Sequence, residues 1–124
     1  MSTWNLNLRF LLEGVTLIAL GFAGWALGAG ASEWLLAFAL PLAAATIWGS
    51  FNVPGDPSRS GKAPVAVPGW LRLIIEVSIL AAGLWACLWL WGPTAGALFG
   101  LGLVVHYAFS GDRIRWLLGT VDAP

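Results

Sequence analysis

Four charged side chains occupy matched places in an otherwise apolar chain. Arg9 and Glu13 lie four residues apart, as do Arg72 and Glu76, and each pair opens a long apolar stretch. Residues four apart share one face of a helix. Each glutamate would lie about two turns inside its helix, and an unpaired charge within a bilayer costs about 2.5–3.5 kcal/mol. We therefore expect both carboxylates to face the protein interior and to find partners there.

The partners of these charges are expected to come from a neighbouring helix. Arginine placed before glutamate is the weaker order for a pair within one helix. We therefore predict crossed pairs, Arg9 with Glu76 and Arg72 with Glu13. Two interpretations remain open. The four charges could form an interhelical clasp that fixes helix register, or an ion or proton site, because an intramembrane ionisable residue is by default a functional candidate.

His106 is the one histidine of the chain, and Tyr107 follows it inside an apolar stretch. A single histidine without cysteines or carboxylates nearby in sequence does not make a metal site. With Tyr107 it could relay protons, because the ordinary pKa of imidazole lies close to neutral pH. A hydrogen bond to a neighbouring helix is the other interpretation, and the one we favour. No nucleophile–base set or nucleotide-binding loop is visible, so we expect neither an enzyme nor a bound cofactor.

The composition indicates a membrane protein. Of its 124 residues, 59% are hydrophobic and 10% are charged, whereas soluble domains average roughly 45–50% and 25%. The formal net charge is zero, which gives no electrostatic reason to expect a nucleic-acid partner. We expect residues 1–124 to form a single membrane domain with lipid as its surroundings.

Four apolar segments are long enough, or nearly so, to cross a bilayer, which takes about 20 residues. They cover residues 6–30, 34–51, 70–91 and 94–110. We expect the first to be retained, because its apolar core exceeds the roughly 7–15 residues of a cleaved signal peptide. The proline-rich segment 52–69 is expected to be a loop, and 111–124 an amphipathic segment at the membrane interface.

The basic residues predict an orientation. The turns between the first and second spans and between the third and fourth contain no Lys or Arg, whereas all six basic residues fall at the opposite ends of the spans: Arg9, Arg59, Lys62, Arg72, Arg113 and Arg115. Basic residues are retained on the cytoplasmic side. Both termini and the central loop are therefore expected in the cytoplasm.

The two halves of the chain resemble each other. The first span opens with LRFLLE at residues 8–13 and the third with LRLIIE at 71–76. Each half would be a helical hairpin beginning on the same side of the membrane, which makes the halves parallel repeats. We predict an all-α fold: an integral membrane four-helix bundle built from two parallel-repeat helical hairpins. Convergence of two helix starts on one interfacial pattern is the alternative.

Proline and glycine mark further positions in the spans. Pro41 lies inside the second span, where it removes a backbone hydrogen bond and predicts a hinge or a fixed kink, of which we favour the kink. Glycines at four-residue spacing permit close helix contact in lipid, either within the bundle or between protomers. These glycines are Gly24, Gly28, Gly92, Gly96 and Gly100.

Several short motifs resemble the YrdB family of small bacterial membrane proteins, a family of unknown function. They are Arg9-Phe10-x-x-Glu13, Leu40-Pro41-Leu42-Ala43-Ala44, Trp48-Gly49-x-Phe51 followed by Val53-Pro54, and Leu71-Arg72-x-x-x-Glu76. The resemblance covers roughly residues 5–110. It implies four helices in the bacterial cytoplasmic membrane and supplies no activity, substrate or catalytic residue.

Two functions fit this sequence. A small ion, proton or solute transporter or channel is favoured slightly by the repeat, the four charges, Pro41 and His106, and four short helices would need an oligomer, such as a homodimer, to form a pathway. The alternative is a non-catalytic interaction subunit that supports a larger membrane assembly, for which glycine-lined helix surfaces suffice.

Overall fold

The computed structural model describes residues 2–56 and 63–119, and almost all regular structure in it is helical. Outside the described residues lie two basic residues of the predicted loop, Arg59 and Lys62, and residues 120–124 of the predicted terminal segment. A pair of two-residue strands runs parallel, with Phe51 opposite Val65. The elements are α1 (Thr3–Leu27), α2 (Ala31–Ser50), β1 (Phe51–Asn52), β2 (Val65–Ala66), α3 (Gly69–Trp91), α4 (Pro93–Ala108) and α5 (Gly111–Leu117).

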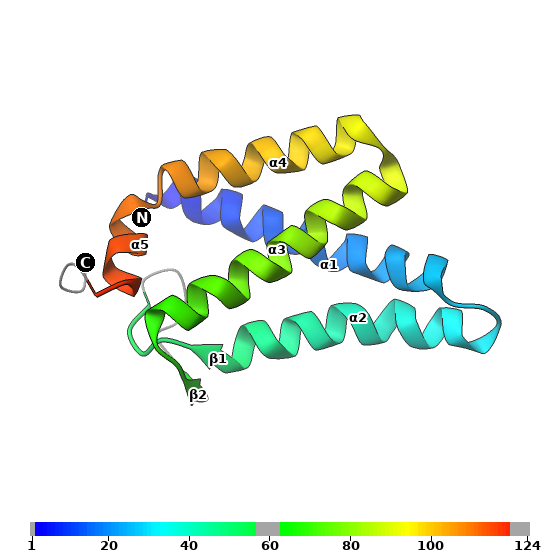
Figure 1. Cartoon of the computed structure of the whole chain (residues 1–124), viewed down its shortest axis with the longest axis horizontal. Coiled ribbons are helices and arrows are strands. Elements are labelled where there is room, and N and C mark those ends of the chain that lie inside the picture. Colours follow the sequence, from blue (N-terminus) through cyan, green and yellow to red (C-terminus); the bar gives the residue numbers. More distant parts are fainter. Residues whose placement is uncertain (1, 57–62, 120–124) are drawn as a thin grey trace.

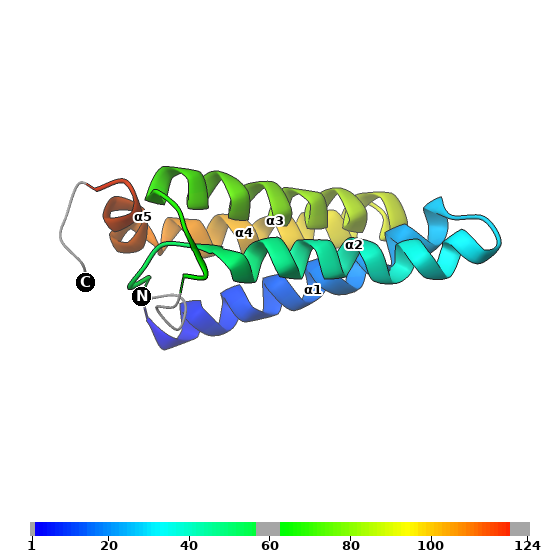
Figure 2. The same cartoon turned by 90° about the horizontal axis from the view of Figure 1, so that it is seen from below.

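The four long helices lie side by side along the long axis of the molecule (Figures 1 and 2). The α1–α2 and α3–α4 turns are at one end, which we call the turn end. The strands, α5 and the start of α1 are at the other end (Figure 1). Helix α1 is central because it packs against α2, α3 and α4, whereas α2 barely touches α3. The all-α prediction is therefore confirmed.

The helices follow the predicted spans with small shifts at their ends. Helix α1 ends at Leu27 rather than near Gly30, because the tight turn into α2 occupies this segment. A Cβ at Gly28 would overlap the backbone of Ser32 and Glu33, and Gly30 has a φ of 63°, which glycine adopts readily. By length and composition α1, α2 and α3 could each cross a membrane. The pair α4 and α5, bent by 69°, would count as a fourth if it is one broken span.

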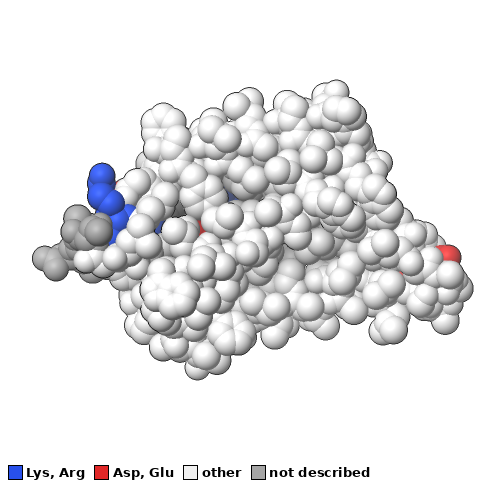
Figure 3. Space-filling view, viewed as in Figure 1, with Lys and Arg blue, Asp and Glu red and all other residues white. Residues whose placement is uncertain are grey.

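The distribution of side chains is inverted relative to that of a water-soluble protein. Large apolar side chains cover the flanks, as at Phe10 (77% exposed) and Leu35 (68%). The face in Figure 3 is almost wholly uncharged, with basic atoms at one end and an acidic group at the turn end. Charged side chains such as Arg72 and Glu76 are instead buried inside. Several apolar helices with this exterior are compatible with a membrane protein.

Glycines allow the closest approaches between helices. A Cβ at Gly24 would overlap the backbone of Leu36, so α1 and α2 contact each other main chain to main chain. At Gly83, a position the sequence did not single out, a Cβ would overlap the Thr16 side chain where α3 meets α1.

The remaining predicted glycines have different surroundings. A Cβ at Gly96 would overlap the Leu88 side chain, whereas one at Gly100 would make only an ordinary contact. Gly92 has a φ of 91° and forms the α3–α4 turn. Helix α2 continues through Pro41 from Ala31 to Ser50.

Candidate functional site: a buried charge cluster

Six charged side chains gather at the end of the molecule that carries α5. They come from α1, the segment after β1, α3 and α5, and we call them the charge cluster: Arg9, Glu13, Asp56, Arg72, Glu76 and Arg113. Three arginines face three carboxylates, so the formal charges of the cluster cancel. Because buried charges are tolerated only when they are paired and hydrogen-bonded, this balance is what permits their burial.

Glu76 lies at the centre of the cluster and is fully buried. Its Oε2 accepts hydrogen bonds from Arg9 Nη2 at 2.7 Å and from Arg113 Nη2 at 3.0 Å. Its Oε1 accepts from Arg113 Nη1 at 2.8 Å and from the Tyr107 hydroxyl at 3.1 Å. Arg72 Nε adds an ion pair at 3.6 Å from Oε2. One carboxylate therefore joins side chains from α1, α3, α4 and α5.

The predicted crossed pair of Arg9 with Glu76 is present in the structure, and the arginines also have partners that the sequence did not indicate. Arg9 contacts Glu76 across helices, and its Nε donates to Glu13 within α1 at 3.0 Å. Arg72, the predicted partner of Glu13, uses Nη1 to donate to the carbonyls of Trp48 at 2.8 Å and Phe51 at 3.0 Å. The last carbonyls of a helix lack partners within the helix. Arg72 therefore ties the end of α2 to α3.

Asp56 and Arg113 are cluster members that the sequence reasoning missed. Arg113 donates from Nε to Asp56 Oδ1 at 2.9 Å and from Nη2 to Oδ2 at 2.8 Å, a two-point contact. Burial disfavours the charged form of Arg113, but the hydrogen bonds with Asp56 and Glu76 outweigh it and raise the pKa of Arg113. The guanidinium therefore stays protonated, and it links the segment after β1 to the centre of the cluster.

Helix α5 turns Arg113 inward because of its own short pattern. Arg113 and Leu117 lie four apart and are both buried, whereas Arg115 is exposed. The absence of a side chain at Gly69 lets the Leu117 carbonyl approach the start of α3. The predicted amphipathic segment is therefore a helix here, and one of its two basic residues points into the protein. The available signal was this four-residue spacing together with Gly69.

A second polar group joins α1 to α4 next to the cluster. Asn5 Oδ1 lies 2.7 Å from His106 Nδ1, and Asn5 Nδ2 donates to Ser110 Oγ at 2.9 Å. The Ser110 hydroxyl donates to the His106 carbonyl at 2.6 Å. All three residues are fully buried. His106 thus makes an interhelical hydrogen bond, and the partner, Asn5, had not been singled out.

The described residues contain no group of three or more His, Cys, Asp or Glu side chains that could hold a metal ion. Carboxylates of the cluster instead face guanidinium groups, which occupy the oxygen atoms that a cation would need. Within the described part of the chain the chemistry of this site is charge pairing and hydrogen bonding.

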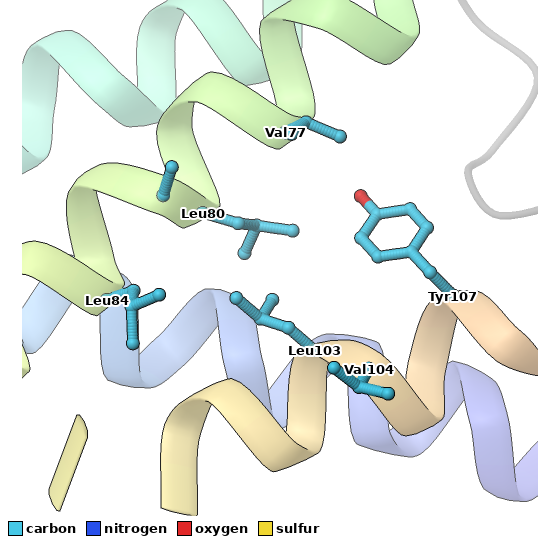
Figure 4. A pocket seen from close by; sticks show the side chains of 7 residues that line it. Val77, Leu80, Leu84, Leu103, Val104 and Tyr107 are labelled. Atoms are coloured by element: carbon cyan, nitrogen blue, oxygen red, sulfur yellow. The ribbon is translucent and has the colours of Figure 1, made fainter. Parts of the chain in front are cut away.

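Grooves between the helices include three that described residues line with almost wholly apolar walls. One of about 290 Å³ lies between α3 and α4, with Leu80 and Leu103 in its walls and Tyr107 at one end (Figure 4). One of about 430 Å³ between α1 and α2 includes Pro41. A third of about 330 Å³ lies beside α1 and α4. None of these three is lined by Glu13, Glu76 or His106.

Comparison with known proteins identifies the family. Residues 7–105 match the family model described as "Protein of unknown function (DUF2568)". The chain is 40% identical over 118 residues to the uncharacterised protein YrdB of Bacillus subtilis (strain 168), which covers 95% of this chain and 96% of the relative. The chain belongs to this YrdB-like family. The match confirms the resemblance expected from the sequence motifs, and no solved structure matches the chain.

The matched region of the YrdB-like family holds most of the site, although part of it lies beyond. Residues 7–105 include Arg9, Glu13, Asp56, Arg72 and Glu76 but stop before the α4 and α5 side chains that complete the contacts. Arg113 and Tyr107 lie past this limit, within the longer stretch that aligns with YrdB over 118 residues. The family has no described activity to carry over to these residues.

Proposed function

We propose that the chain crosses the bacterial cytoplasmic membrane four times, with α1 to α4 as spans and the charge cluster at the cytoplasmic side. The apolar flanks and the position of the arginines at one end support this arrangement. Glu33 lies near the start of α2 at the turn end. Helices α1 and α3 begin at the same end, with Arg9 and Arg72 at matched positions, which supports the parallel repeat of two hairpins.

Labelling in intact cells tests this orientation. In a Cys87→Ala background, single cysteines replace Ala31 in the turn end and Ala66 in β2, both of which are exposed. A membrane-impermeant maleimide should label the Ala31→Cys chain, and should label Ala66→Cys only after the cells are opened. Labelling of Ala66→Cys in intact cells would overturn the orientation.

For the function itself we propose a non-catalytic subunit that supports a larger membrane assembly. The observation that carries this proposal is that both carboxylate oxygens of Glu76 accept their hydrogen bonds from other side chains of the protein. Four hydrogen bonds from Arg9, Arg113 and Tyr107 reach its two oxygens. A transport site must exchange its partners with solute along a wet path, whereas these contacts are those of a clasp that sets helix register.

A small proton or ion transporter, acting as a homodimer, is the second candidate function. One observation favours it: the Glu13 side chain is 17% exposed, so the cluster is open to its surroundings at that carboxylate. Opposite charge is close by, since Arg9 Nε donates to the same Glu13. Proton or ion exchange at Glu13 would not need Glu76 to release its partners.

Two measurements on the full chain separate the candidates. Membranes that contain the tagged protein are solubilised directly into polymer-bounded lipid particles. The mass of these particles is then measured by native mass spectrometry. The assembly proposal expects particles that contain a second kind of protein, and particles with this chain alone would overturn it. In liposomes loaded with a pH-sensitive dye, the parent and Glu13→Gln chains should both match empty liposomes. Proton flux that disappears in Glu13→Gln would establish transport instead.

A further inference from the structure

The hydrogen bonds of Asn5 determine which nitrogen of His106 carries a proton. Asn5 Nδ2 faces the carbonyls of Phe109 at 3.1 Å and His106 at 3.3 Å. A carbonyl only accepts hydrogen bonds, so this end of the amide must be the NH₂ group. The other end, Oδ1, lies 2.7 Å from His106 Nδ1 and can only accept. Nδ1 must therefore be the donor, and in a neutral ring Nε2 carries the lone pair.

The lone-pair nitrogen of His106 is left without a protein partner. Nε2 is buried, and it has no hydrogen-bond partner among residues 2–56 and 63–119. A buried polar atom in this state is costly, and almost all such atoms in folded proteins are bonded to protein or to an ordered water. The position therefore calls for a small ligand that can donate a hydrogen bond.

Arg9, one turn after Asn5 on α1, has an atom of the complementary kind. Its Nε and Nη2 donate to Glu13 and Glu76, while Nη1 is buried and has no hydrogen-bond partner within the described part of the chain. Nη1 can only donate. His106 Nε2 therefore needs a hydrogen-bond donor, and Arg9 Nη1 needs an acceptor.

The register between α1 and α4 brings Arg9 and His106 together. Asn5 bonds to Ser110 one turn before Arg9, and a Cβ at Gly102 would lie 3.0 Å from Leu12 Cδ2 on the other side of Arg9. Because the helices are antiparallel, residue 9 falls opposite the stretch between residues 102 and 110, where His106 lies.

We propose that His106 Nε2 and Arg9 Nη1 bind a single buried water molecule. Water accepts one hydrogen bond from Nη1 and donates another to Nε2, and both roles are required at this position. A metal or ammonium ion is disfavoured beside a guanidinium, and an anion cannot donate to Nε2. Two partners meet the minimum for a buried water, which typically makes two to four hydrogen bonds. The proposal does not depend on either candidate function.

This water would connect the two polar groups of the protein. Hydrogen bonds then run without a break from Ser110 and Asn5 through His106 and the water to Arg9 and Glu76. The chain of bonds passes from α4 to α1 and on to α3. Helix register would be fixed by one connected network instead of two separate ones, and such networks gain from mutual polarisation.

Nuclear magnetic resonance of the imidazole nitrogens tests the proposal directly. Because His106 is the one histidine, protein made with ¹⁵N-labelled histidine in lipid bilayers gives one pair of ring signals. Nδ1 should show a one-bond coupling to hydrogen, and Nε2 should show none. A magnetisation-transfer peak should join Nε2 to water protons. A hydrogen on Nε2, or the absence of the water peak in the parent protein, would overturn the proposal.

Two variants separate the water from the tautomer. Arg9→Lys keeps the positive charge but removes Nη1, so the water peak should weaken at least twofold while Nδ1 keeps its hydrogen. Ser110→Ala is the matched control, because it changes the same polar group without touching either water-binding atom, and both signals should persist. Loss of the water peak in Ser110→Ala with its retention in Arg9→Lys would contradict the assignment, and the result on the parent protein stands whether or not a variant folds.

Discussion

The helices are held together by different kinds of contact at the two ends of the molecule. At the turn end, α1 and α2 approach because Gly24 has no side chain to separate them from the Leu36 backbone. At the other end, contact depends on long charged side chains that meet at Glu76. This backbone contact requires only that one residue of α1 lack a side chain where α2 approaches it. The charge cluster requires specific side chains from four separate elements, so it selects one arrangement of the whole chain.

Removing the central carboxylate of the charge cluster should cause the largest loss of stability and so test the difference between the two ends. Glu76→Gln leaves Arg9, Arg72 and Arg113 buried with too little opposing charge, and breaking a buried pair in this way costs about 3–5 kcal/mol. The unfolding midpoint in detergent, followed by circular dichroism, should fall strongly. Glu33→Gln at the turn end is the control and should cost at most about 1 kcal/mol, from the lost helix-dipole interaction. Equal losses in both variants would remove the distinction between the ends.

The next effect concerns two arginines within one short helix. Arg113→Gln breaks the contacts to Asp56 and Glu76 and should cost about 3 kcal/mol. Arg115→Gln changes the exposed arginine of the same helix and should cost at most about 1 kcal/mol. Limited proteolysis after residue 113 should become faster only in the first variant. Similar rates for both would show that α5 is not held by the cluster.

At the turn end the sensitive feature is a missing side chain. Gly24→Ala forces α1 away from α2 and should cost about 2 kcal/mol through overpacking. Gly14→Ala lies in the same helix, and apart from its chain neighbours and the nearby helix backbone no atom lies within 4 Å of the new Cβ. It should gain up to about 1 kcal/mol from the better helix propensity of alanine. The two unfolding midpoints should therefore move in opposite directions. A shift in the same direction would contradict a close backbone contact between α1 and α2 at Gly24.

The smallest predicted change removes one hydroxyl from the charged end. Tyr107→Phe deletes the hydrogen bond to Glu76 while keeping the ring, and it should cost about 1.5 kcal/mol. In a Glu76→Gln background the same substitution should cost less, because its charged acceptor is already gone. Additive losses in a double-mutant cycle would show that the two side chains act independently.

Hydropathy predicted the helical elements, because helix formation is a property of single segments. The repeated Arg–Glu spacing in the two halves of the chain predicted the interhelical contact of Arg9 with Glu76. Gly28 and Gly30 displaced the end of the first helix, since turn geometry is decided by contacts with α2. Asp56 could not be predicted, because it follows proline and glycine in a loop and nothing local distinguishes it from a solvated carboxylate. Its role depends on the docking of α5, which is a tertiary event.

Asn5 shows the same limit on a smaller scale. In sequence it is an ordinary polar residue at the start of a span, where contact with headgroups would satisfy it. Its function in the structure comes from the antiparallel register with α4, which brings His106 and Ser110 to its side chain. Charge scarcity singled out the glutamates, but neutral amides carry no comparable signal, so their partners emerge only once the helices are placed.

The late position of Arg113 in the chain has a consequence for biosynthesis. The ribosome completes α1, α2 and α3 before it reaches α5, so from Glu76 onward the nascent protein holds three cluster carboxylates against two arginines. Arg113 supplies the missing positive charge. Premature termination between residues 76 and 113 should therefore yield an unstable fragment that membrane proteases remove.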